Sequence, residues 1–76
     1  MLIIKIMWET SRGLISANMK IGDAKKRLAS KLGCKTESIS FYSNGIELRD
    51  DAITFAECGV ADDGNIEAKI VLSNNP

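Results

Sequence analysis

One segment, residues 21–32, has the spacing of an amphipathic helix, and this helix constrains the fold more than any other feature of the chain. Its apolar residues recur at intervals of three, four and four residues, at Ile21, Ala24, Leu28 and Leu32. Gly33 follows and can end the helix in a left-handed conformation. Because the other apolar segments are short and rich in β-forming residues, we expect a single main helix packed on a sheet.

The remaining apolar residues predict β-strands separated by polar turns. The expected strands cover residues 1–8, 14–19, 39–42, 46–48 and 66–72. The first two are expected to form a hairpin around a polar turn at residues 9–13, and Ser43-Asn44-Gly45 is expected to be a second turn. Alternation predicts that the inward-facing residues are Ile39, Phe41, Ile66, Ala68, Ile70 and Leu72.

A capping motif lies between the last two expected strands. Thr54 and Glu57 have the three-residue spacing in which a hydroxyl and a carboxylate each accept a hydrogen bond from a free backbone N–H. We therefore expect one helical turn here, which would bury Phe55 between the two polar residues.

The size of the chain limits it to one domain. A chain of 76 residues buries only about 60% of the surface that its unfolded form exposes, which leaves little room for a deep catalytic cleft. Hydrophobic residues make up 45% and charged residues 26%, a composition typical of a folded protein. We expect the domain to cover residues 1–72 and residues 73–76 to form a flexible polar tail.

The balanced charge argues against a nucleic-acid partner, and the lack of a long apolar run argues against a membrane partner. Ten basic residues balance ten acidic ones, whereas nucleic-acid affinity depends on an excess of Lys and Arg. Basic residues concentrate in residues 20–35 and acidic ones in residues 47–67, so we expect one basic and one acidic face. The chain has no apolar run of transmembrane length.

The sequence contains no recognisable catalytic or cofactor-binding group. It has no histidine, the commonest general base and a common metal ligand. Without a histidine, neither Cys34 nor Cys58 has the usual base of a catalytic thiol, and two cysteines are too few for a disulfide scaffold. We therefore predict that the protein is not an enzyme and that it binds no cofactor and no metal. We expect free thiols, and hence a reducing compartment, the cytoplasm or the nucleus. We also expect a monomer.

The order of elements and several short motifs resemble the ubiquitin-like family. Ile39-x-Phe41 followed by Gly45, Leu48 and Asp50 resembles the family's strand–turn–strand segment. Thr54-Phe55, Gly59-Val60 and the turn Asp63-Gly64-Asn65 before Ile66 resemble the segments that follow it. The resemblance spans residues 1–72. It implies an α+β fold of the ubiquitin-like β-grasp type, with a mixed sheet of four to five strands, the two terminal strands central, and one main helix across it.

The resemblance also implies a role in binding other proteins. Conjugated members of the family end in Gly-Gly, and this chain ends in Leu72-Ser73-Asn74-Asn75-Pro76 and contains no Gly-Gly. We therefore expect a non-catalytic interaction domain, as an adaptor or as the N-terminal module of a larger protein, whose partners could include components of the ubiquitin pathway or the proteasome. The alternative is a covalent modifier whose functional C-terminus is processed or lies outside this sequence.

The expected binding residues are Trp8, Tyr42, Lys69 and Val71. The family's apolar binding patch would correspond here to Trp8 or Glu9, Ser40 or Tyr42, and Lys69 or Val71. The patch is therefore altered, and binding to ordinary ubiquitin receptors is not expected. Trp8 and Tyr42 are aromatic candidates for anchor residues, and alternation places Lys69 on the outward side of the last strand.

Overall fold

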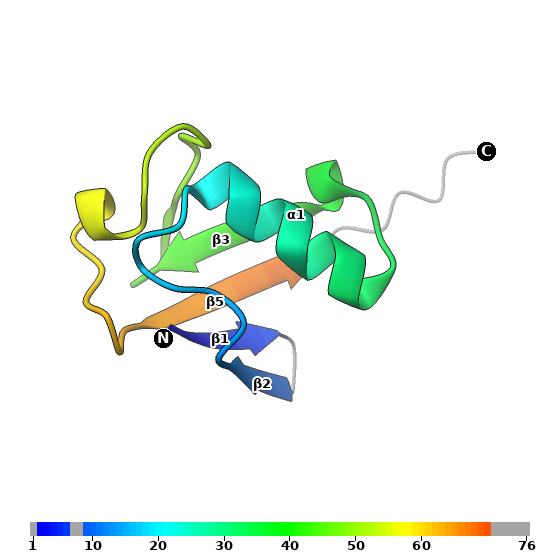
Figure 1. The fold of residues 1–76 in the computed structure, drawn as a ribbon, viewed down its shortest axis with the longest axis horizontal. Coiled ribbons are helices and arrows are strands. Elements are labelled where there is room, and N and C mark those ends of the chain that lie inside the picture. Colours follow the sequence, from blue (N-terminus) through cyan, green and yellow to red (C-terminus); the bar gives the residue numbers. More distant parts are fainter. Residues whose placement is uncertain (1, 7–8, 71–76) are drawn as a thin grey trace.

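The chain folds as a five-stranded sheet covered on one side by one helix, as seen in the computed structural model, which describes residues 2–6 and 9–70 (Figure 1). Its elements in chain order are β1 (Ile3–Ile6), β2 (Glu9–Arg12), α1 (Ile21–Leu32), η1 (Thr36–Ser38), β3 (Ile39–Ser43), β4 (Ile46–Glu47), η2 (Ala56–Cys58) and β5 (Asn65–Ile70). The two η elements are single turns of 3-10 helix.

The sheet is mixed and has the strand order β2-β1-β5-β3-β4. β1 and β5 pair in parallel, whereas β1–β2, β3–β5 and β3–β4 are antiparallel. The first and last strands are therefore neighbours inside the sheet, and α1 crosses one of its faces (Figure 1). This arrangement confirms the predicted α+β class, the mixed sheet and the inner position of the terminal strands.

The N-terminal hairpin differs from the prediction. The expected turn residues 9–12 form β2, whereas residues 14–19, expected to be a strand, form a link between β2 and α1. Ile15 and Ala17 are buried in this link, and their carbonyls accept hydrogen bonds from the N–H groups of Leu2 (2.9 Å) and Ala56 (2.9 Å). The apolar pattern of residues 14–19 therefore reflects burial in the core and not a strand. β2 can be polar because it lies at the edge of the sheet.

The helix forms where its spacing predicted, with one difference at its end. Ile21, Ala24 and Leu28 are buried, and Gly33 adopts φ 71°, with its N–H bonded to the Ala29 carbonyl at 2.8 Å. Leu32, expected in the core, is 37% exposed. It points in nearly the same direction around the helix axis as Leu28. Its exposure therefore reflects its position at the end of α1, beyond the part that covers the core.

The core joins α1 to the inner face of the sheet. Ile66 and Ala68 of β5 are buried, as their alternation predicted, and Ile4 and Ile6 of β1 are buried beside them. Ile70 is partly buried against the same core, whereas the predicted inward residue Leu72 lies outside the described residues. Phe41 of β3 is fully buried, as is Phe55, the residue before η2, and their rings meet edge to face at 5.4 Å between centroids.

The turn between β3 and β4 confirms the predicted role of Asn44 and Gly45. Ser43 pairs with Ile46, so that Asn44 and Gly45 alone form the loop between the two strands. Both have positive φ, 52° and 81°, which is the requirement of the tight hairpin turn that favours Asn-Gly. The turn fixes which residues of β3 and β4 lie opposite one another, and it therefore helps to position Tyr42.

The predicted capping motif is present in part. The Thr54 hydroxyl accepts a hydrogen bond from the Glu57 N–H at 3.1 Å. Among the hydrogen bonds of the described residues, there is no reciprocal bond from the Thr54 N–H to the Glu57 carboxylate. The turn that follows is the 3-10 turn η2, which leaves Phe55 buried as expected.

Replacing Thr54 with Ala is expected to lower the free energy of unfolding by about 0.5–2 kcal/mol, because the Glu57 N–H loses its acceptor. Urea unfolding followed by circular dichroism measures the change. Thr54→Ser keeps a hydroxyl and should retain most of the stability. Equal losses in both variants would show that the methyl group, and not the hydrogen bond, matters here.

Candidate protein-binding surface

The sheet face opposite α1, which we call the outer face, is polar, and none of the described helices covers it. Because side chains alternate along each strand, the residues between the buried positions project from this face. The described members are Ile3, Lys5, Thr10, Arg12, Ser40, Tyr42, Glu47, Asn65, Glu67 and Lys69. Ile3 is the one purely aliphatic side chain in this set, so the outer face lacks an apolar patch within the described residues.

Two of the four predicted binding residues, Tyr42 and Lys69, lie together on the outer face. The Lys69 ammonium is 4.5 Å from the centroid of the Tyr42 ring, the geometry of a cation–π contact. Tyr42 is half-buried and Lys69 is exposed. The other two predicted residues, Trp8 and Val71, lie outside the described residues.

Carboxylates flank Tyr42 on both neighbouring strands. Tyr42 lies opposite Glu67 of β5 and opposite Glu47 of β4. Directly opposed residues project from the same face of a sheet, so both acidic side chains lie beside the tyrosine. Glu47 also pairs with Arg49, whose Nε is 3.3 Å from its Oε1.

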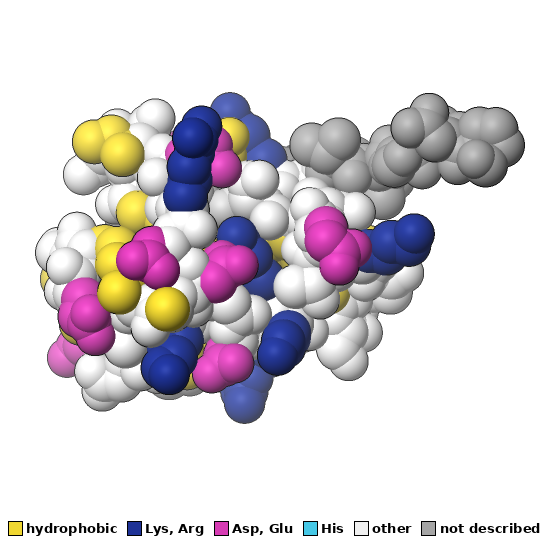
Figure 2. All heavy atoms as spheres, turned by 90° about the horizontal axis from the view of Figure 1, so that it is seen from above, with side chains coloured by type: hydrophobic (Ala, Val, Ile, Leu, Met, Phe, Trp, Pro, Cys, Tyr) yellow, Lys and Arg dark blue, Asp and Glu magenta, His cyan; other side chains and the backbone are white. Residues whose placement is uncertain are grey.

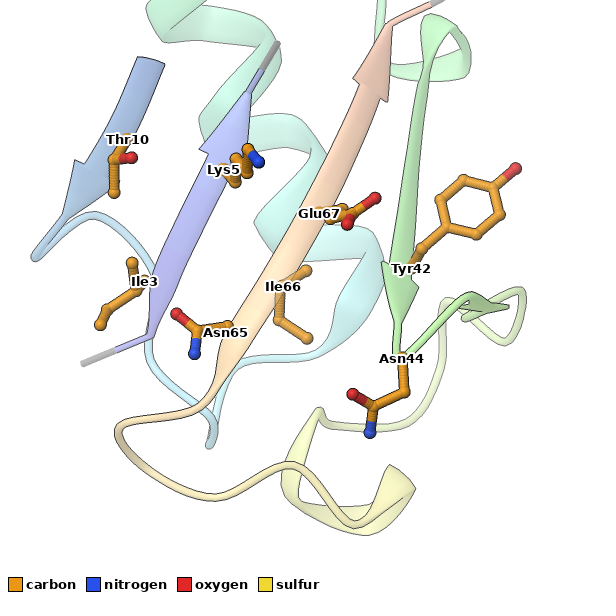
Figure 3. Close-up of a pocket in the computed structure, with 8 residues that line it drawn as sticks. All are labelled: Ile3, Lys5, Thr10, Tyr42, Asn44, Asn65, Ile66 and Glu67. Atoms are coloured by element: carbon orange, nitrogen blue, oxygen red, sulfur yellow. The ribbon is translucent and has the colours of Figure 1, made fainter. Parts of the chain in front are cut away.

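The outer face is hollowed beside this cluster. The hollow has a volume of about 240 Å³ and is lined by Ile3, Lys5, Thr10, Tyr42, Asn44, Asn65, Ile66 and Glu67 (Figure 3). In Figure 3, Glu67 lies between Lys5 on β1 and Tyr42 on β3. The hollow is smaller than the roughly 300–1,000 Å³ of small-molecule sites. Its size fits a single side chain of a protein partner.

Three further members of this surface, Lys5, Glu47 and Glu67, were not among the predicted binding residues. Alternation does place Lys5 and Glu67 on the outward side of their strands, and this was the available signal. The register that sets Glu67 opposite both Lys5 and Tyr42 joins strands far apart in the chain. Local sequence patterns do not contain that register.

Other kinds of site find little support in the described part of the chain. No group of three or more His, Cys, Asp or Glu residues within residues 2–6 and 9–70 could hold a metal ion. Cys34 and Cys58 are free thiols, as expected. In the same described ranges, no helix has the length and apolar character needed to cross a membrane.

Acidic and basic side chains are intermixed on the face seen in Figure 2, which differs from the predicted separation into a basic and an acidic face. One cause is that the helix and the loop after β4 meet. Lys25 of α1 pairs with Asp51 at 2.7 Å, and the Arg27 guanidinium donates to the Leu14 carbonyl at 3.2 Å. These contacts place basic residues of the helix next to acidic residues or carbonyls from other segments.

Comparison with solved structures decides the fold. The N-terminal ubiquitin-like domain of the 4931431F19Rik protein superposes with a TM-score of 0.83 over 99% of this chain and 77% of that one, at 19% sequence identity. The chain has a ubiquitin-like fold. The ubiquitin-like domain of Arabidopsis thaliana protein At2g32350 gives a TM-score of 0.81 over 99% of this chain and 80% of that one, at 17% identity.

The likeness confirms the predicted β-grasp fold and concerns structure, not sequence. No family model matches the sequence, and no curated protein matches it. The ubiquitin-like fold is therefore a scaffold, and the function depends on the side chains that this chain presents on its surface.

Proposed function

We propose that this ubiquitin-like fold serves as a non-catalytic protein–protein interaction domain that binds its partner through the outer face. The observation that carries the proposal is the cluster of Tyr42, Lys69 and Glu67 on a sheet face that the helix leaves open. The domain would act as an adaptor or as a module of a larger protein. The similar ubiquitin-like domain of the 4931431F19Rik protein is an N-terminal module of this second kind.

The chemistry of the outer face suits protein recognition. Protein interfaces combine a few aromatic or arginine anchors with a polar rim, and tyrosine is among the residues most often found at energetic hot spots. Tyr42 has this position, with charged and amide side chains around it and a hollow at its side. A sheet also holds these side chains on rigid backbone, so little ordering is needed on binding.

The expected partners are proteins, with components of the ubiquitin pathway or the proteasome as candidates, and the expected compartment is the cytoplasm or the nucleus. These expectations rest on the partners and the compartment that the resemblance to ubiquitin-like proteins implies. They are tested by capturing partners from a cell extract with the purified chain and then measuring binding to each captured protein in pure form.

Tyr42→Ala is expected to weaken binding of a captured partner by about tenfold or more, because truncation removes the aromatic anchor of the face. Isothermal titration with the purified partner measures the change. Lys26→Ala on α1 is the control, because Lys26 is exposed and lies on the helix, away from the outer face.

Equal affinity of the wild type and Tyr42→Ala would remove the outer face from the proposal. Weakening by Lys26→Ala alone would assign the binding surface to α1 instead. Circular dichroism of both variants ensures that a lost interaction reflects the surface and not loss of the fold.

A further inference from the structure

The Tyr42 ring already holds a cation in the isolated chain. The Lys69 ammonium lies 4.5 Å from the ring centroid. Lys69 comes from β5 and is exposed, so solvent reaches it. Within residues 2–6 and 9–70, this contact is the one interaction found for its ammonium. The ammonium is therefore weakly held and can leave the ring.

The residues directly opposite Tyr42 on both neighbouring strands are carboxylates, and Lys5 lies on the far side of Glu67. Glu67 and Glu47 flank Tyr42 in the register, and Glu67 is exposed. Glu47 is engaged by Arg49, whereas Glu67 has no ion-pair partner among the described residues. Figure 3 shows the Glu67 carboxylate directed from β5 toward the side of Tyr42. An aromatic ring beside an available carboxylate is a suitable environment for a cationic group.

We propose that Tyr42 and Glu67 form an arginine-binding site, and that Lys69 occupies the ring until an arginine of the partner displaces it. This inference rests on the proposed function, because it names the group that the outer face recognises in its protein partner. Lys69 then acts as an internal competitor, and its removal strengthens binding.

Arginine fits this arrangement better than lysine or an acidic side chain does. Its planar guanidinium can stack on the Tyr42 ring while two of its N–H groups bond to the Glu67 carboxylate. A lysine of the partner would have no such advantage over Lys69, since both carry the same compact ammonium. A carboxylate in the same position would be repelled by Glu67, which has no ion-pair partner among the described residues.

The test uses the peptide acetyl-Gly-Arg-Gly-amide as probe, titrated into the isotope-labelled chain and followed by NMR. The same peptide with citrulline, a neutral group of the same shape, is the control for charge. We expect the arginine peptide to shift the amides of Tyr42 and Glu67, and the citrulline peptide to leave them unchanged. The Lys69 Hε resonances, displaced by the ring current in the free chain, should move toward ordinary lysine values as the peptide binds.

Two matched variants separate competition from net charge. Lys69→Thr should bind the arginine peptide about two- to fivefold more tightly, the range expected when an exposed cation–π contact no longer competes. Lys5→Thr removes the same charge from the same face, on the other side of Glu67. It leaves the contact between Lys69 and the Tyr42 ring in place. Its gain should therefore be smaller. Glu67→Gln should weaken binding of the peptide.

Several results would overturn the inference. These are equal gains in Lys69→Thr and Lys5→Thr, equal shifts with the citrulline peptide, shifts that cluster away from Tyr42, and Lys69 resonances that do not move on binding. No binding of the arginine peptide to Lys69→Thr would have the same consequence. If that happens while Tyr42→Ala still loses its captured protein partner, the proposed function stands and the arginine site alone is wrong.

Discussion

Phe55→Ala is expected to lower the free energy of unfolding by about 3–5 kcal/mol, which is a large part of the stability of a chain of this size. Phe55 is fully buried and packs edge to face on Phe41. It is also the residue that anchors the segment around η2, since its carbonyl accepts the N–H groups of Cys58 at 3.0 Å and Val60 at 3.1 Å. Truncation would leave a cavity between this segment and the sheet. Urea unfolding followed by circular dichroism gives the change.

The controls separate the aromatic contact from simple burial. Phe55→Leu keeps most of the volume and should cost less than the alanine variant. A double-mutant cycle with Phe41→Leu should show a coupling of about 0.5–1.5 kcal/mol, the usual range for an aromatic pair. A loss below about 1 kcal/mol for Phe55→Ala would mean that the η2 segment packs differently from the structure described above.

Much of the fold could be predicted because its strongest signals are local. The helix at residues 21–32, the Asn44-Gly45 turn and the inward residues of β3 and β5 each follow from spacing or turn chemistry within a few residues. These elements appear where the sequence placed them. The order of elements then restricted the topology to a mixed sheet under one helix, and the structural comparison agrees.

The N-terminal hairpin could not be predicted because burial and strand formation separate there. Ile15 and Ala17 are buried without belonging to a strand, and polar residues 9–12 form the edge strand β2. An alternating apolar pattern measures contact with the core. It does not show whether the backbone hydrogen bonds go to a neighbouring strand or, as here, to Leu2 and Ala56.

The binding surface was predictable only in part for a related reason. Outward positions follow from alternation, so Tyr42 and Lys69 could be named as candidates. Their contact, and the place of Glu67 beside Tyr42, depend on the antiparallel register of β3 and β5, which lie more than twenty residues apart in the chain. Long-range register is set by the packing of the whole sheet, and short motifs carry little information about it.

The start of α1 is closed by the loop after β4, and Gly22 makes this possible. Backbone carbonyls of the loop cap the helix in place of a side chain, with the Ile21 N–H bonded to Ile53 at 2.8 Å and the Gly22 N–H to Asp51 at 3.1 Å. A Cβ at position 22 would lie 3.0 Å from the Asp51 Cβ and 3.1 Å from its carbonyl oxygen. Lys25 holds the Asp51 carboxylate at 2.7 Å, which opposes movement of the loop.

Gly22→Val is therefore expected to lower the free energy of unfolding by about 1–3 kcal/mol, although valine is the better helix former of the two. The matched control is Ser30→Val, which places the same side chain at an exposed position of α1 and should change stability little. Urea unfolding of both variants measures the difference. Equal stability of the two would show that the loop moves aside at little cost, and that its carbonyls do not cap the helix firmly. A selective loss in Gly22→Val would show that close backbone approach, and not helix propensity, fixes how the helix meets the loop.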